Sequence, residues 1–266
     1  MEYDEIIFAL KDVFQIDIEN ELLKHKESDL IACSYLTSLY WGTLSLSFDH
    51  DSTTTFLFQT ITQNIANTVL AITKLSLCGL SFQAEILIRN LLENCFLLLN
   101  VMLDHHKRER FIDSAKKKNT YSVWKKYFTF KNMYEAIENY MSNLKDEAND
   151  ENLSENLKKM YHEYSSAVHN DYFTQVMLLR SKPKNPDDIM KLNLWGEYTD
   201  YLPELLHSLC FINHFTKMLF NYILADNNIE FTFDDLIENR AESEIWKDAV
   251  FLHLFLTEYY LLAWNY

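Results

Sequence analysis

Two polar patches within otherwise apolar helical segments carry the residue types that could do chemistry. The first is in AEILIRNLLENCFLLLN, where Glu85, Arg89 and Glu93 stand four residues apart and therefore share one helix face. An unpaired buried charge is costly, so this stripe must meet polar partners. Two interpretations are open: an ion-pair ladder at the rim of a bundle, or Arg89 and Glu93 pointing into a polar pocket between helices, where bundles build their sites.

The second patch is YHEYSSAVHND, residues 161–171. In a helix, Ser165 and His169 lie one turn apart on one face, with His162 a turn before Ser165. Histidine can act as a general acid or base near neutral pH, and Ser165 could hold the imidazole or position a phosphate. The alternative is a polar face that serves packing alone.

A basic segment, residues 107–131, follows the first patch. It holds nine of the 24 basic residues and two acids, so it carries +7; since the whole chain carries −15, the remainder carries −22. Its stretch KKKNTYSVWKKYFTFK interleaves lysines with aromatic residues, a pattern typical of single-stranded nucleic-acid binding. The alternative, which we favour for the aromatic residues, is a packed aromatic side beneath solvated lysines. The candidate RNA contacts are Lys116, Lys117, Lys118, Lys125 and Lys126.

Metal and nucleotide chemistry find little support in the sequence. Asp104, His105 and His106 form the one tempting metal motif, but adjacent helical histidines point about 100° apart and do not converge on an ion. We interpret this stretch as a helix end with favourable cations. The four cysteines include no CxxC pair and indicate reduced core residues. With three glycines, no Gly-rich phosphate loop is present. We predict no metal and no nucleotide or other cofactor.

Glycine and proline scarcity decides the fold class. The chain has three of each in 266 residues, whereas a sheet protein of this length needs many turns built from such residues. We predict an all-α, multi-helix bundle built on a long antiparallel hairpin of residues 56–77 and 82–103. Gly79 interrupts the pair, and Ser81 with Glu85 resembles a capping box.

We expect one helical domain, residues 1–266. Within it, N-terminal helices (1–48) pack on a core bundle (54–175) and C-terminal helices (200–266). The segment 243–264 is apolar on more than one side, which favours a homodimer. The apolar helix predicted at residues 86–103 contains Arg89 and Glu93, and the N-terminus is acidic and amphipathic, so we predict no membrane span, no signal peptide and a cytoplasmic location.

The two polar patches together resemble a known pairing. GLSFQAEILIRNLLENCFLLLNVMLD is an Arg-x-x-x-Glu helix, and YHEYSSAVHND is a Tyr-x-x-x-Ser-x-x-x-His helix. The pair is similar to a group of bacterial all-helical proteins associated with the HEPN superfamily. Many HEPN proteins are metal-independent ribonucleases, with an Arg, four to six residues and then a His on one helix of a dimerising bundle. His169 fits that His, but residues 162–164 hold no Arg, so His162 or Arg89 would supply the cation.

The resemblance implies RNA cleavage by attack of a 2′-hydroxyl on the adjacent phosphate, in a toxin-like effector of antiviral (abortive infection) defence. His169 would move the proton, Arg89 would stabilise the phosphate, and Ser165 and Glu93 would orient them. We accordingly expect His169 to face Arg89 and Glu93 between two helices. The alternative is a non-catalytic helical binding or scaffold module, such as a sensor or antitoxin-like partner, which the acidic balance and the missing motif Arg favour.

Overall fold

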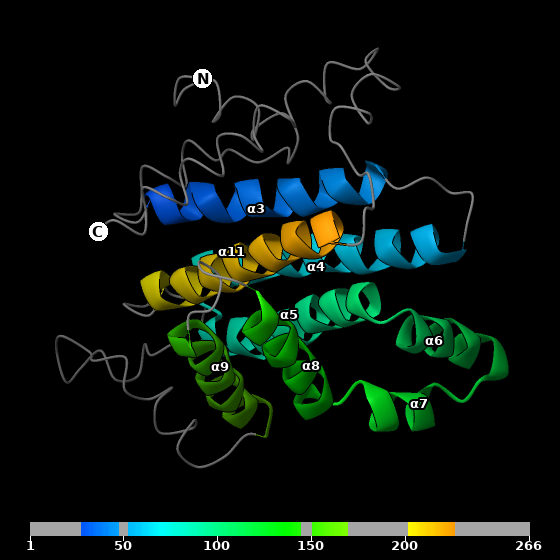
Figure 1. Ribbon diagram of the computed structural model, residues 1–266. Coiled ribbons are helices and arrows are strands. Elements are labelled where there is room, and N and C mark those ends of the chain that lie inside the picture. The colour runs from blue at the N-terminus through cyan, green and yellow to red at the C-terminus, as the bar shows by residue number, and fades with distance from the viewer. Residues whose placement is uncertain (1–27, 48–52, 145–150, 170–201, 227–266) are drawn as a thin grey trace, which may run out of the picture.

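The described part of the protein is all-α, which confirms the predicted fold class. The computed structural model describes residues 28–47, 53–144, 151–169 and 202–226, and these form eight helices and no strand (Figure 1). The predicted helices at the two ends of the chain, residues 1–23 and 243–264, lie outside the described residues. The helices are α3 (Ser28–Ser47), α4 (Thr53–Leu77), α5 (Ser81–Leu103), α6 (His105–Lys117), α7 (Thr120–Tyr127), α8 (Phe130–Asn143), α9 (Glu151–His169) and α11 (Leu202–Asp226).

The α4–α5 hairpin forms as expected, and Gly79 makes its turn. Gly79 adopts φ 71°, in the left-handed region. The Leu80 amide donates to the Leu75 carbonyl at 2.8 Å and the Gly79 amide to the Ser76 carbonyl at 3.1 Å, which is the Schellman pattern that ends a helix. The expected capping box is absent, because α5 begins at Ser81 itself and its N-cap, Leu80, has no side chain that can cap.

Helix α5 is the centre of the bundle. It packs against α4 on one side and against α11, α8 and α9 on others, with α3 lying beyond α4 and α11 (Figure 1). Leu92, Phe96 and Leu99 are buried there, at 0%, 1% and 0% exposed. By length and composition α5 could cross a membrane, but most of it is buried inside this bundle, as in the core helix of a soluble protein.

The stretch predicted as a helix end is a junction between two helices. Asp104 ends α5 and caps α6, where its Oδ1 accepts from the Lys107 amide at 3.0 Å. A cationic side chain of α6 still stabilises the C-terminal end of α5, because Arg108 Nη1 donates to the Val101 carbonyl at 3.0 Å. Asn100, fully buried, donates to the Phe96 and Met133 carbonyls, both at 3.0 Å. These bonds fix α6 and α8 against the end of α5.

Candidate functional site

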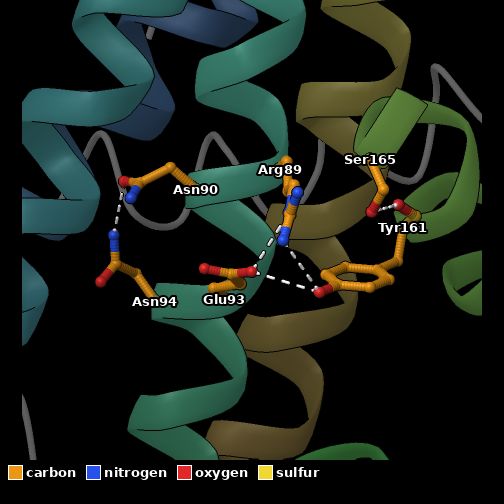
Figure 2. Close-up of polar contacts among 6 residues, drawn as sticks. All are labelled: Arg89, Asn90, Glu93, Asn94, Tyr161 and Ser165. Carbon is orange, nitrogen blue, oxygen red and sulfur yellow. Dashed lines mark hydrogen bonds and ion pairs between the residues drawn. The ribbon is translucent and has the colours of Figure 1, made fainter. Parts of the chain in front are cut away.

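Arg89, Glu93 and Tyr161 form a closed polar triangle between α5 and α9 (Figure 2). Arg89 Nε donates to Glu93 Oε1 at 3.2 Å, and Arg89 Nη2 donates to the Tyr161 hydroxyl at 3.3 Å. That hydroxyl donates in turn to Glu93 Oε1, also at 3.3 Å. The Arg89–Glu93 pair is therefore both an intrahelical ion pair and half of a contact between two helices.

The triangle is partly withdrawn from water. The Arg89 and Glu93 side chains are 18% and 26% exposed. Partial burial, followed by the Glu93 carboxylate, raises the pKa of Tyr161, so its phenol stays protonated as a donor. Within the part of the chain that the structure describes, Arg89 Nη1 is buried and makes no hydrogen bond. The guanidinium thus keeps donor capacity that the triangle does not use.

A stack of aromatic rings packs against the Tyr161 ring of the triangle. The Tyr161 ring lies parallel to Phe130, with centroids 3.4 Å apart and an interplanar angle of 2°. Phe130 in turn stacks on Phe96, with centroids 5.2 Å apart and an angle of 10°. The Arg89 guanidinium carbon lies 5.2 Å from the Tyr161 ring centroid. Helices α5, α8 and α9 therefore hold Tyr161 in place through ring contacts as well as hydrogen bonds.

Tyr161 occupies the position opposite Arg89 and Glu93 in which we expected His169. Helix α9 reaches His169 two turns after Tyr161, and the side chains of residues 166–169 lie outside the described residues. The Ser165 hydroxyl donates to the backbone carbonyl of Tyr161, one turn back on its own helix (Figure 2). In this conformation the Ser165 hydroxyl bonds to neither Arg89 nor Glu93, so no contact among the described residues supports the orienting role that we expected for Ser165.

The Glu85–Arg89–Glu93 ladder forms only in its second half. Among the described residues, Glu93 is the one carboxylate in an ion pair with Arg89. Burial, followed by the charge of Glu204 on α11, raises the pKa of Glu85 to about 7. Burial also raises the pKa of Tyr164, and the Glu85 carboxylate adds to that shift. Two positions of α5 one turn apart, Glu85 and Arg89, are therefore close to two positions of α9, Tyr164 and Tyr161.

His162 lies beside the triangle, next to Tyr161. Its side chain is exposed, and its ring packs edge-on against Tyr161 with centroids 6.0 Å apart. Asn90 and Asn94 also stand apart from the triangle, because Asn94 Nδ2 donates to Asn90 Oδ1 at 2.8 Å (Figure 2). The chemistry available at this spot is therefore that of one arginine, one carboxylate and one protonated phenol.

The basic segment forms the α6–α7 hairpin and continues to the start of α8, where Phe130 contacts Tyr161 of the triangle. The five candidate lysines are all exposed, as predicted for a solvated face. Among the aromatic residues, Phe128 is fully buried, whereas Trp124 and Tyr127 are partly buried and packed against the core; Tyr121 departs from the expected core role at 78% exposed. Asn132 Nδ2 donates to the Lys126 carbonyl at 2.8 Å, which folds the end of α7 against the start of α8, where Phe130 stacks on Tyr161.

Tyr161 and Phe130 are the two site residues that we did not list from the sequence. Tyr161 does open the Tyr-x-x-x-Ser-x-x-x-His pattern, four residues before Ser165, so its helix face was available as a signal. Phe130 carries no such signal, because it looks like any core aromatic residue. No group of three His, Cys, Asp or Glu side chains that could hold a metal ion occurs among the described residues. His105 lies 3.9 Å from Glu109 in an exposed pair.

A scan of protein-family models returns no match to this chain, and searches of the curated proteins and of the solved structures return no significant match either.

Proposed function

We propose that the protein is a HEPN-like ribonuclease that cleaves RNA without a metal ion, as a toxin-like effector in antiviral (abortive infection) defence. The observation that carries the proposal is the junction of a cationic surface with the Arg89 triangle. Phe130, which stacks on Tyr161, follows Lys126 by four residues. Four residues of chain span at most about 14 Å, so an RNA strand lying on α7 would come within reach of Arg89.

In the proposed reaction, the 2′-hydroxyl oxygen of a ribose bonds to the adjacent phosphorus while the bond from phosphorus to the 5′ oxygen breaks. His169 would take the proton of the 2′-hydroxyl, and the 5′ oxygen would leave with a proton from solvent. The products are a 2′,3′-cyclic phosphate and a 5′-hydroxyl end. Arg89 would stabilise the charge that develops on the phosphoryl oxygens, since its planar fork suits phosphate.

The triangle must rearrange for this reaction, and α9 must move as well, because His169 lies two turns beyond Tyr161 on that helix and has to reach the phosphate that Arg89 binds. Arg89 Nη1 is the donor left for a phosphate, and it is enclosed. RNA binding would therefore have to move what covers it or compete with Tyr161 for Nη2. The support for such competition is that the phosphate is a full anion and the Tyr161 phenol is neutral, so a charge-assisted hydrogen bond replaces a weaker one.

A second candidate function is the non-catalytic helical binding or scaffold module. One observation favours it: Glu93 already neutralises Arg89, and the Ser165 hydroxyl is satisfied within its own helix. The triangle is then a structural tie between α5 and α9 in which, within the described residues, Arg89 Nη1 alone makes no hydrogen bond, and it needs no ligand to hold the two helices together. In either case we propose a homodimer on the apolar faces of residues 243–264, which lie outside the described residues. Sedimentation at micromolar protein concentration would distinguish this homodimer from a monomer.

The test compares purified wild-type protein with Arg89→Ala and His169→Ala. The control is His207→Ala, which removes an exposed histidine on α11. Each is incubated with an unstructured RNA and with its 2′-O-methyl form, in the presence of EDTA, and the ends are analysed. We expect cyclic phosphate ends from wild type and His207→Ala only on the RNA with free 2′-hydroxyls. The two site variants should lose about 100-fold or more of the rate.

Thermal melts establish that each variant is folded. Expression in cells gives a second readout, in which wild type should arrest growth and degrade total RNA while His169→Ala should not. If folded wild-type protein cleaves no RNA in either assay, the ribonuclease proposal is wrong. The scaffold module then remains, because it requires the triangle only for stability.

A further inference from the structure

We infer that the exposed face of the α6–α7 hairpin is a binding site for single-stranded RNA, in which an unpaired base stacks on Tyr121 and the adjacent phosphates lie on Lys118 and Lys125. The inference rests on the proposed function in taking RNA as the ligand, and it adds that the strand must be unpaired. Tyr121 and Lys125 stand four residues apart on α7 and so share one helix face. Lys118 lies in the turn directly before α7, in the left-handed conformation at φ 54°.

Tyr121 is the observation that separates this surface from an ordinary lysine-rich face. It is 78% exposed, whereas Trp124 and Tyr127 of the same short helix pack inward on Phe128. Phe56 and Tyr222 are the other large apolar side chains exposed in the described residues, at 60% and 38%. Tyr121 is the most exposed of the three, and it alone lies in a lysine-rich stretch. An aromatic ring held open beside cations is the arrangement on which unpaired bases stack.

The lysines of this surface are available to an anion. Of the five candidate lysines, Lys117 alone has an ion pair among the described residues, with its Nζ 3.6 Å from Asp113 Oδ2, and both side chains of that pair are about half exposed or more. The basic segment carries +7 while the rest of the chain carries −22. The negatively charged remainder of the chain would repel a polyanion, and the positively charged hairpin would attract it. RNA should therefore bind at the hairpin.

The Tyr121 ring should also make the surface distinguish paired from unpaired RNA. In a duplex the bases are stacked on one another, so Tyr121 cannot reach a base face and only the phosphates remain for the lysines. In a single strand the base can leave its neighbours and lie on the phenol ring. The surface should therefore prefer the single strand, whereas a purely electrostatic patch would favour the duplex, which carries the higher charge density.

The experiment measures binding by fluorescence anisotropy, with labelled 2′-O-methyl RNA of about 12 nucleotides, a length within the range that single-stranded sites cover. This probe lacks the attacking 2′-hydroxyl, so the assay does not depend on cleavage. The same sequence is measured as a duplex. The variants are Tyr121→Ala, Tyr121→Phe and the double substitution Lys118→Gln with Lys125→Gln. The matched controls are Tyr222→Ala, an exposed aromatic residue on α11, and Lys74→Gln, an exposed lysine at the far end of α4.

We expect wild type to bind the single strand more tightly than the duplex. Tyr121→Ala should weaken single-strand binding by about tenfold with little effect on the duplex, and Tyr121→Phe should keep the affinity because it keeps the ring. The lysine double variant should weaken both and reduce the slope of log affinity against log salt by about 1.4. The two controls should change neither.

Two results would overturn the inference: Tyr121→Ala binding the single strand as tightly as wild type, or wild type binding the duplex as tightly as the single strand. Either would leave a charged surface that recognises polyanions in general. Binding as expected with no cleavage of ordinary RNA would uphold this inference and refute the ribonuclease proposal, so the two failures are distinguishable.

Discussion

Replacing Phe96 with alanine tests the centre of the described fold and the support of the site at once. Phe96 is 1% exposed on α5, and its ring contacts Phe130, Tyr134 and Phe215 at centroid distances of 5.2, 6.4 and 6.5 Å. A buried aromatic side chain removes about 150–250 Å² from water, which at about 25 cal/mol per Å² corresponds to roughly 4–6 kcal/mol. Measured Phe→Ala losses in cores of about 3–5 kcal/mol agree with that range.

Urea denaturation followed by circular dichroism measures the loss. With a denaturant slope of about 3 kcal/mol/M, a loss of about 3–5 kcal/mol lowers the midpoint by roughly 1–1.7 M. Phe56→Ala is the matched control, because it makes the same chemical change on α4 at a side chain that is 60% exposed. It should alter the free energy of unfolding by no more than about 0.5 kcal/mol. Equal midpoints for the two variants would refute the placement of Phe96 beneath the Phe130–Tyr161 stack.

Three further predictions concern single polar groups. Asn100→Ala removes a fully buried amide that donates to two backbone carbonyls, and it should cost about 2–3 kcal/mol in the same urea assay. Tyr161→Phe keeps the ring stack but removes the hydroxyl from its two charged partners, and it should cost about 1–2 kcal/mol while Tyr161→Ala costs more. Glu85 has a pKa raised to about 7 in the folded protein by burial and by Glu204, above its ordinary value of 4.5. The folded state therefore binds this proton more tightly than the unfolded state, and stability should fall as pH rises from about 4.5 to 7, by about 1–3 kcal/mol for this part-exposed group. Glu85→Gln should flatten the pH dependence of thermal unfolding and stabilise the protein at pH 8.

Each of these has an outcome that would contradict it. Unchanged stability in Asn100→Ala would mean that water replaces the amide. A Tyr161→Phe variant as stable as wild type would mean that the triangle contributes nothing beyond its ring stack. If Glu85→Gln and wild type lose stability in parallel between pH 5 and pH 8, another group carries the pH dependence.

Local sequence features predicted the elements of the fold well because their causes are local. The apolar periodicity of α4 and α5 and the φ preference of Gly79 act over a few residues, so the hairpin follows from them directly. The α5–α6 junction was harder to place. The DHHKRER stretch combines the end of one helix with the cap of the next, and only the position of Asp104 shows where one stops and the other begins.

The candidate site was predicted in part, for a reason that lies in helix register. The sequence identifies α5 and α9 as the two helices with polar stripes, and it supplies Arg89 and Glu93 as one side of the contact. It does not determine how far α9 is shifted along α5. That placement brings Tyr161 to Arg89 and Glu93, while the side chain of His169 lies outside the described residues.

The sequence alone determined that the described part of this protein is all-α, that Arg89 and Glu93 share one face of an apolar helix, and that the positive charge gathers in residues 107–131. Propensity, periodicity and composition are properties of short stretches and need no fold to be evaluated. Tertiary packing decided that Tyr161 completes the triangle, that Phe130 links it to the basic hairpin, and that Tyr121 stays in solvent while Trp124 and Tyr127 pack against the core. The first two depend on contacts between residues 31 and 72 positions apart, whose alignment is set by the packing of the entire core.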